Sequence, residues 1–394
     1  MRIGMLLFGG TYPPDVRVEK EARILAEAGH EIFLLAADKD GRAVEESLEP
    51  LRVRRYPYRA GWLASKWTAL VTLLTWRSPH WEAQIERFVR DKGIDALHVH
   101  DLPAVASAIA VGRRLGVPVV YDMHEYYPAA VTFWPRSRVA RIFQTPARYH
   151  HYERAAVTGV DRVVPAVEEV RDMVLAAGVP NDRVFLFRNV EDSADAVAWH
   201  GAPDGEFVVA FAGGFGPHRG VDTLVKAMPE LRSLVPGAKL LLMGSGPGED
   251  DLKEMARDLG VEDAVELTGW IDISEMRDRL SRVSVGTATF TRSAHTDTML
   301  PHKLFQYMAM GLPVVVTDCK PVERFVTETG AGEVAKSGDP SSLAQALARM
   351  ADPERAAAAS EAGKRAVREQ YNLDIEGKQL VALYDGLVRE TSSS

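Results

Sequence analysis

The chain of 394 residues has little of several features that mark particular protein classes. Cys319 is its one cysteine, which excludes an internal disulfide framework and a cysteine-rich zinc cluster and is typical of a reducing compartment. No apolar run reaches the roughly 18 to 20 residues of a membrane-spanning helix, and the nearest approach, Trp62–Trp76, is interrupted by Lys66. The first residues have no small-residue cleavage site. We therefore expect a cytoplasmic protein without a spanning or targeting segment.

An excess of positive charge is also missing. The 47 lysines and arginines stand against 55 aspartates and glutamates, a net charge of -8. This balance argues against a nucleic-acid-binding protein and means that an anionic partner must meet a local patch. A hydrophobic content of 46% is that of an ordinary folded chain, and the length predicts two domains or a little more.

Short β-branched or leucine-rich runs alternate with longer helical patterns from one end of the chain to the other. This alternation predicts parallel sheets built from βαβ units. The expected strands are Ile3–Phe8, Glu31–Ala36, Ala96–His100, Val117–Asp122 and Arg162–Pro165, then Phe207–Ala212, Lys239–Met243, Ala264–Leu267, Ser284–Thr287 and Pro313–Thr317.

A weak stretch around residues 190–206, rich in Asp, Ala and Gly, separates the two series of strands. We therefore expect an α/β protein of two doubly wound, Rossmann-like parallel-sheet domains, residues 1–195 and 196–372, facing an interdomain cleft. A helical pattern over Asp374–Glu390 predicts a C-terminal helix, within residues 373–394, that packs back toward the first domain.

Polar residues follow three strands of the first half. Gly9 and Gly10 follow the first strand and permit a close backbone approach, although the dinucleotide fingerprint GxGxxG is absent. Asp101 ends the sequence HVHD, and His124 and Glu125 follow the next strand. At the ends of neighbouring parallel strands these groups would supply acid, base or hydroxyl-binding functions, unless they only cap their loops. His98, His100 and His124 have no diagnostic ligand spacing, so no metal site is predicted.

In the second half, the loop Gly213–Gly220 follows the first strand and precedes a helix. Its glycines Gly214 and Gly216, with His218 and Arg219, could cradle a diphosphate at the helix start, and Gly244 opens a similar, weaker turn. A flexible loop with a solvated arginine is the plain alternative. Further on, Pro301 marks a helix start where Lys303 and free amides would also attract an anion, and Gln306 could reach a sugar hydroxyl.

Together these motifs resemble the retaining glycosyltransferases of family 4, which have the GT-B fold. The resemblance covers almost the whole chain, in order: DVRVEKEARILAEAGHEI, HVHD, YDMHE, FRNV, AGGFGPHRGVDTLVKAM, LLMGSGP, LTGWI and PHKLFQYMAMGLPVVV. It implies a metal-independent hexosyltransferase without a cofactor, which moves a sugar from a nucleotide diphosphate sugar, a UDP-sugar being favoured. The acceptor would be a hydroxyl of a glycan, a lipid-linked molecule or a natural product in glycoconjugate or polysaccharide biosynthesis.

The resemblance also assigns roles to single residues. It places Gly9 and Gly10 near the donor phosphate and acceptor, and His124 against the donor sugar or in the transfer itself. Arg219 takes the place of the lysine in the family's paired diphosphate clamp, but the partner arginine falls at Gly214, so half of the clamp is missing. The remaining donor contacts are expected from Trp270 and Ile271 at the nucleobase, from Asp297, Thr298, Met299 and Leu300, and from Gln306 at the ribose, where Thr298 and Gln306 replace the family's pair of glutamates.

Two segments of the first half mix aromatic and basic residues. Residues 59–81 and 133–154 hold tryptophans, phenylalanines and arginines, which predicts either a peripheral contact with anionic lipid and the acceptor or a core of tryptophans beneath a solvated basic face. The alternatives to transfer are a nucleotide-sugar epimerase of a related two-domain fold and a nucleotide-sugar-binding protein without catalysis.

Overall fold

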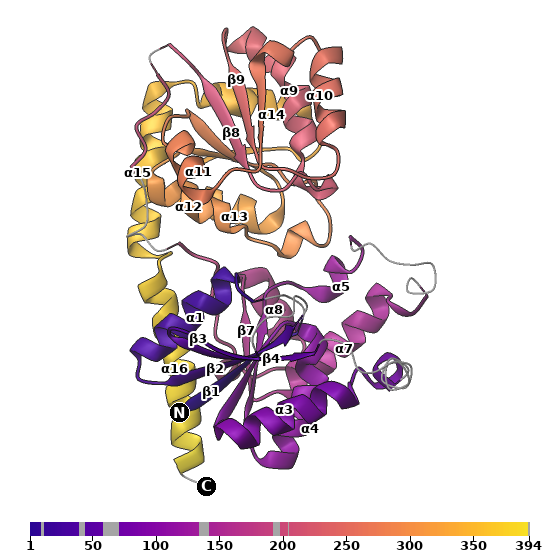
Figure 1. The fold of residues 1–394 in the computed structure, drawn as a ribbon. Coiled ribbons are helices and arrows are strands. Elements are labelled where there is room, and N and C mark those ends of the chain that lie inside the picture. The colour runs from indigo at the N-terminus through magenta and orange to yellow at the C-terminus, as the bar shows by residue number, and fades with distance from the viewer. Residues whose placement is uncertain are drawn as a thin grey trace. The chain divides into compact units, whose positions relative to one another are not determined.

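A computed structural model describes residues 1–8, 12–38, 44–57, 71–133, 142–191, 198–203 and 205–392. The chain divides into two compact units, Met1–Arg188 with Glu376–Ser394 and Asn189–Ile375 (Figure 1). Gly9, Gly10 and the domain boundary predicted near residue 195 lie outside the described residues, as do residues 59–70 and 134–141 of the two aromatic and basic segments.

The first unit is built on a seven-stranded sheet with the order β3-β4-β2-β1-β5-β6-β7. Its strands are parallel except for β3, which pairs antiparallel with β4. The expectation of a purely parallel sheet is wrong at this edge, because the two residues between β3 and β4 allow only a hairpin return. The strands are β1 (Arg2–Leu7), β2 (Glu31–Asp38), β3 (Glu45–Leu48), β4 (Leu51–Pro57), β5 (Ala96–His100), β6 (Val119–Met123) and β7 (Arg162–Pro165).

Helices cover both faces of this sheet, which is why β5, β6 and β7 are buried along their whole length. Helix α1 begins after Asp15, whose side chain accepts hydrogen bonds from the backbone N–H groups of Arg17 and Val18, and α16 lies beside it (Figure 1). The helices are α1 (Val16–Glu27), α3 (Pro79–Lys92), α4 (Val105–Leu115), α5 (Tyr127–Ala130), α7 (Pro146–Gly159), α8 (Glu168–Ala176) and α16 (Leu373–Ser392).

The second unit has a six-stranded parallel sheet with the order β10-β9-β8-β11-β12-β13. Its apolar strands pack against α9, α10 and α14, while α12 and α13 lie across the sheet from them (Figure 1). The elements are β8 (Val208–Ala212), α9 (Val221–Leu234), β9 (Lys239–Met243), α10 (Glu249–Asp258), β10 (Val265–Gly269), α11 (Ile273–Leu280), β11 (Val285–Ala288), α12 (His302–Met310), β12 (Val314–Thr317), α13 (Lys320–Thr329), β13 (Gly332–Ala335), α14 (Pro340–Arg349) and α15 (Pro353–Glu369).

Helix α16 is anchored in the first unit by buried polar contacts. Glu376 is 1% exposed, and its Oε2 accepts the backbone N–H of Arg188 at 2.9 Å. The Arg188 guanidinium pairs with Glu376 and also with Glu168, whose Oε1 lies 2.7 Å from Nη2. Among the described residues no helix is long and apolar enough to cross a bilayer.

Replacing Glu376 with alanine should therefore destabilise the first unit. We expect Glu376→Ala to lower its free energy of unfolding by about 2 to 3 kcal/mol, since the half-buried Arg188 guanidinium loses its ion pair with the buried Glu376. The matched control is Glu390→Ala on the same helix, where a 62% exposed carboxylate pairs with Arg162 and a loss below about 1 kcal/mol is expected. Urea unfolding followed by circular dichroism measures both, and equal losses would contradict this role of Glu376.

Candidate functional site

The ends of β5 and β6 bring the polar residues of the first unit together. The two strands are parallel neighbours, as predicted, and His100 of β5 lies opposite Asp122 of β6. Asp101 follows β5 and His124 follows β6, so both side chains lie at the carboxyl edge of the sheet. This is the edge at which doubly wound sheets bind their ligands.

Asp122 is the centre of this cluster. Its carboxylate is fully buried and contacts three side chains: Arg17 Nε at 2.9 Å, His100 Nδ1 at 2.9 Å and His124 Nε2 at 2.7 Å, all measured to Oδ2. Burial alone would raise the pKa of Asp122, but the Arg17 guanidinium and the histidines hold it well below its ordinary value. A permanent negative charge is thus fixed beneath the strand ends.

This charge sets the protonation of the two neighbouring histidines. Burial opposes a charge on His124, yet the carboxylates of Asp101 and Asp122 outweigh it and raise the pKa of His124 to about 9. His100 is more deeply buried, and burial lowers its pKa. At neutral pH the structure therefore presents His124 as an imidazolium, a hydrogen-bond donor, above a neutral His100.

Asp101 and Glu125 are the acidic groups at the surface of the cluster. Asp101 has a φ of 68° and a ψ of 158°, a conformation that costs a non-glycine residue on the order of 1–3 kcal/mol. Its Oδ1 is buried and has no hydrogen-bond partner among the described residues. Burial raises the pKa of Asp101, and burial and the Asp101 charge raise that of Glu125 to about 7. Glu125 can therefore gain or lose a proton near neutrality.

A deeper layer lies under Asp122. Glu21, His98, His100 and Asp122 have potential ligand atoms within 4.8 Å of one another. However, Arg17 Nε lies 3.1 Å from Glu21 Oε1, and Glu21 Oε2 lies 3.0 Å from His98 Nε2. Burial disfavours a charge on His98, but Glu21 raises its pKa to about 9. A guanidinium and an imidazolium already neutralise these carboxylates, so the four residues form an ion-pair network and do not fit a metal ion.

The second unit has a cluster of the opposite kind. Lys303 Nζ, in the first turn of α12, is shielded from solvent, has no hydrogen-bond partner in the described ranges and lies 3.4 Å from the ring centroid of Phe211. Burial and the nearby Arg219 guanidinium lower the pKa of Lys303 well below its ordinary value, and burial lowers that of Arg219. Burial and Arg219 also lower the pKa of His218 to about 4.

Backbone contacts hold this cluster in shape. Thr289 Oγ1 donates to the carbonyl oxygen of Arg219 at 3.3 Å. Gly244 has a φ of 137°, and a Cβ there would lie 2.1 Å from the carbonyl oxygen of Gly213, so the loops after β8 and β9 can approach only with glycine at this position. A Cβ at Gly214 would meet nothing nearer than Ser245 O at 3.8 Å, so sterics do not exclude a side chain there.

The other predicted donor residues are spread around this cluster. Trp270 is 78% exposed, Ile271, Gly216, Met299 and Gln306 are half-buried, and Leu300 is buried. Thr298 donates its hydroxyl to the carbonyl oxygen of His295 at 2.8 Å. Asp297 is occupied within the unit, because it accepts the Lys320 N–H at 3.0 Å and pairs with Arg292. His302, at the start of α12, contacts the buried Glu191 at 2.6 Å.

The sequence prediction missed Arg17, Asp122 and His295. Arg17 and Glu21 lie on the same face of α1 as the buried Val18 and Leu25, a pattern that could have indicated a buried ion pair. His295 is buried, and its ring centroid lies 5.8 Å from that of His218. No sequence signal places it there.

The two aromatic and basic segments divide into packed and exposed parts. Trp76 stacks on Tyr152 with ring centroids 4.5 Å apart, and Trp81 packs on Phe8. These two tryptophans are thus part of the packing. The exposed apolar side chains are Leu74, Phe133, Ile142 and Phe143.

The titration of His124 tests the electrostatics of the first cluster. A proton NMR titration of the imidazole should give His124 a pKa of about 9, and Asp101→Asn should lower it because one of two raising charges is removed. Because this pKa lies above that of the unfolded chain, the stability it contributes is complete below about pH 6.5 and is lost as the pH rises toward 9. A His124 pKa near 6.5 in the folded protein would contradict the arrangement.

Two family models match the chain one after the other. The "Glycosyl transferase 4-like domain" matches residues 14–190, and "Glycosyl transferases group 1" matches residues 206–352. Together they cover most of the two units.

Similar proteins agree with these matches. A phosphatidyl-myo-inositol mannosyltransferase of Mycolicibacterium smegmatis is 24% identical over 98% of this chain and 94% of its own. A GDP-mannose-dependent alpha-(1-6)-phosphatidylinositol monomannoside mannosyltransferase of the same organism is 32% identical over 43% of this chain and 45% of its own. The structure of sucrose-phosphate synthase from Thermosynechococcus elongatus superposes with a TM-score of 0.77 at 17% identity, over 99% of this chain and 100% of that one. The chain belongs to the family 4 glycosyltransferases and has their GT-B fold.

Proposed function

We propose that the protein transfers a hexose or hexose derivative from a nucleoside diphosphate sugar to a hydroxyl group, with retention at the anomeric carbon and without a metal ion. The observation that carries this proposal is the pair Lys303 and Arg219. Both cations are desolvated, and no carboxylate is among the groups that shift the pKa of either one. A diphosphate would supply the missing negative charge and accept hydrogen bonds from both.

The donor's base is proposed to be read by the backbone at Trp270 and Ile271. The sequence favours a UDP-sugar, whereas the name of one relative specifies GDP-mannose. The ribose is proposed to bind Gln306, whose half-buried amide has one acceptor oxygen where a carboxylate has two. Titration with UDP and GDP decides between the two bases.

The acceptor hydroxyl is proposed to bind at the Asp101 turn of the first unit. Asp101 Oδ1 is a buried acceptor without a partner in the described structure, so it can receive the hydroxyl's hydrogen bond. The His124 imidazolium can donate to the sugar or to the departing diphosphate. In the transfer, the bond between the anomeric carbon and the diphosphate oxygen breaks, and the acceptor oxygen bonds the same face of that carbon. The hydroxyl proton passes to the departing phosphate.

The acceptor is proposed to be a glycan, a lipid-linked molecule or a natural product, delivered in part from a membrane surface. Arg148 links two apolar segments by donating to the carbonyl oxygens of Leu73 and Phe143. Leu74 beside the first and Ile142 beside the second are about 70% exposed. Apolar side chains next to a guanidinium suit the headgroup region of an anionic bilayer.

Removing the Arg219 guanidinium should weaken donor binding. We expect the dissociation constant of the preferred nucleoside diphosphate to rise roughly 10- to 100-fold in Arg219→Ala, because charge-assisted hydrogen bonds are lost. Isothermal titration with UDP and GDP in parallel measures this effect and identifies the base. Arg232→Ala is the matched control, since Arg232 is another arginine of the same unit and pairs with Asp263. An unchanged dissociation constant in Arg219→Ala would overturn the diphosphate assignment.

Removing the His124 side chain should affect turnover and spare donor binding. His124→Ala loses the imidazolium above Asp122, and we expect kcat to fall roughly 100-fold or more while the donor dissociation constant stays within about two-fold. His151→Ala, an exposed histidine of α7, is the control and should keep normal turnover. A near-normal kcat in His124→Ala would remove His124 from the catalytic residues.

A further inference from the structure

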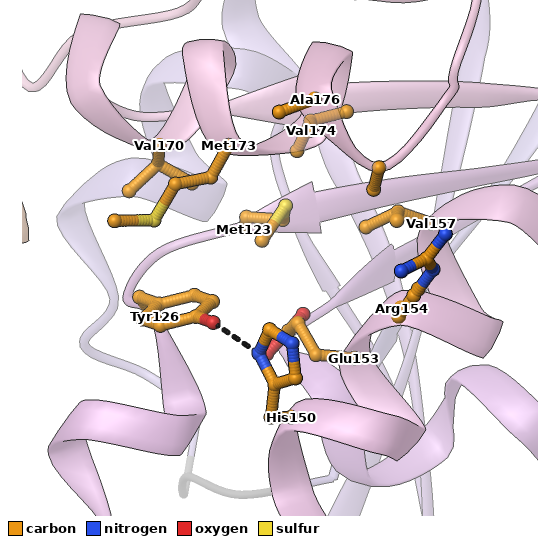
Figure 2. A pocket seen from close by; sticks show the side chains of 11 residues that line it. Met123, Tyr126, His150, Glu153, Arg154, Val157, Val170, Met173, Val174 and Ala176 are labelled. Carbon is orange, nitrogen blue, oxygen red and sulfur yellow. Dashed lines mark hydrogen bonds between the residues drawn. The ribbon is translucent and has the colours of Figure 1, made fainter.

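A pocket of the first unit lies between α7 and α8, beside the end of β6 (Figure 2). It has a volume of about 370 Å³, within the range of small-molecule sites. Most of its lining is aliphatic or thioether: Met123, Val157, Val170, Met173, Val174, Ala176 and Ala177. Such a surface favours an apolar occupant.

One buried carboxyl group interrupts this apolar lining. Glu153 of α7 is 3% exposed, and its Oε1 accepts the Tyr121 hydroxyl at 2.6 Å. Its Oε2 is buried and has no hydrogen-bond partner among the described residues. Burial, against hydrogen bonds from the Tyr121 hydroxyl and the Tyr127 backbone, raises the pKa of Glu153 to about 8, so the group is mostly neutral at pH 7. A buried polar atom left without a partner costs on the order of 1–3 kcal/mol, which a ligand that bonds it would recover.

Charges of both signs lie around the pocket, so neither a cationic nor an anionic head group is matched by the whole site. Arg154 lines it, and no carboxylate pairs with this guanidinium in the described part of the chain, so a cation would be repelled. Asp101 and Glu125 both act on Glu153 as negative charges, so an anion placed at Glu153 would also be repelled. Tyr126 and His150 are joined by a 2.8 Å hydrogen bond (Figure 2).

We propose that this pocket binds an apolar molecule that carries one uncharged hydroxyl group, with its hydrocarbon body among Met123, Val157, Val170 and Val174 and its hydroxyl on Glu153 Oε2. The site is distinct from the Asp101 and His124 cluster and adjoins it along the chain. Met123 and Tyr126 line the pocket, and His124 and Glu125 lie between them in the chain. The proposal does not depend on the transfer reaction, because binding can be measured without donor or acceptor.

The first test compares three eight-carbon probes that differ only in the head group: 1-octanol, n-octylamine and sodium octanoate. Calorimetric titration of the full chain at pH 7 should show 1-octanol binding at least roughly ten-fold more tightly than either charged probe. Tighter binding of the amine or the carboxylate would overturn the assignment of the head group. If all three probes fail to bind, the proposed site is wrong.

Two variants locate the probe. Val174→Phe fills the pocket from α8 and should weaken 1-octanol binding at least roughly ten-fold, whereas Leu175→Phe adds the same ring at the next position, outside the lining, and should change it less than about two-fold. Equal affinities of the two variants for 1-octanol would overturn the proposed location. Circular dichroism checks that both variants fold.

The carboxyl group is tested by replacing it twice. Glu153→Met removes the hydrogen bond and should weaken 1-octanol roughly five-fold, as expected for one neutral hydrogen bond, without weakening 1-chlorooctane. Glu153→Gln keeps the size and a polar oxygen and should bind 1-octanol within about two-fold of the parent chain. Unchanged 1-octanol binding in Glu153→Met would contradict the role of Glu153.

Discussion

The second unit depends on two basic side chains, Lys303 and Arg219, that are held away from water with no carboxylate partner among the described residues. Lys303 rests on the ring of Phe211, and Arg219 lies 5.5 Å from the ring centroid of Phe290. Aromatic faces stabilise a cation less than a carboxylate does, so the pair stays short of negative charge. Close backbone packing holds Arg219 in this position. A Cβ at Gly220 would lie 1.8 Å from the carbonyl oxygen of Thr289, so only glycine lets the end of the loop pack there. Such preorganised, uncompensated charge is what stabilises a departing diphosphate.

The first unit shows the opposite principle. Its buried charges are paired with opposite charges. Arg17 forms ion pairs with Glu21 and Asp122, and the imidazolium of His124 forms ion pairs with Asp101 and Asp122. Asp101 Oδ1 is one of the buried polar atoms that have no hydrogen-bond partner among the described residues of this unit, and it belongs to a strained residue. The unsatisfied groups to which we assign the substrates of transfer lie at strand ends of their own sheets: Asp101 Oδ1 directly after β5, and Lys303 Nζ beside the loop that follows β8.

The sequence predicts the fold well because most strands are continuous apolar runs. Ala96–His100, Arg162–Pro165 and Lys239–Met243 were predicted to the residue. The missed strands are β3 and β4, the last two strands at one side of the first sheet, and β13 at the edge of the second. β4 alternates buried Leu51 and Val53 with Arg52 and Arg54, and β13 is short and begins with Gly332. A run of apolar residues is strong evidence for a central strand, whereas an edge strand with one polar face leaves a weaker signal.

The site was less predictable than the fold. Strand ends at His100, Asp101 and His124 follow from the βαβ pattern, and so does the glycine loop before Arg219. The sequence alone does not single out Asp122 as the centre of the cluster, because its role depends on the contact with Arg17, which lies 105 residues earlier in the chain. The Glu153 pocket was also missed, since it needs the packing of two helices around one carboxyl group that the sequence leaves unmarked.

The central claim is that burial and Arg219 lower the pKa of Lys303 and that a bound diphosphate raises it again. Calorimetric titration of nucleoside diphosphate at about pH 8, above the second phosphate pKa of about 6, in two buffers of different ionisation enthalpy gives the protons taken up on binding. The account predicts measurable proton uptake by the parent chain and a smaller uptake by Lys303→Met. Equal uptake by the two proteins, at measurable affinity in both, would contradict it.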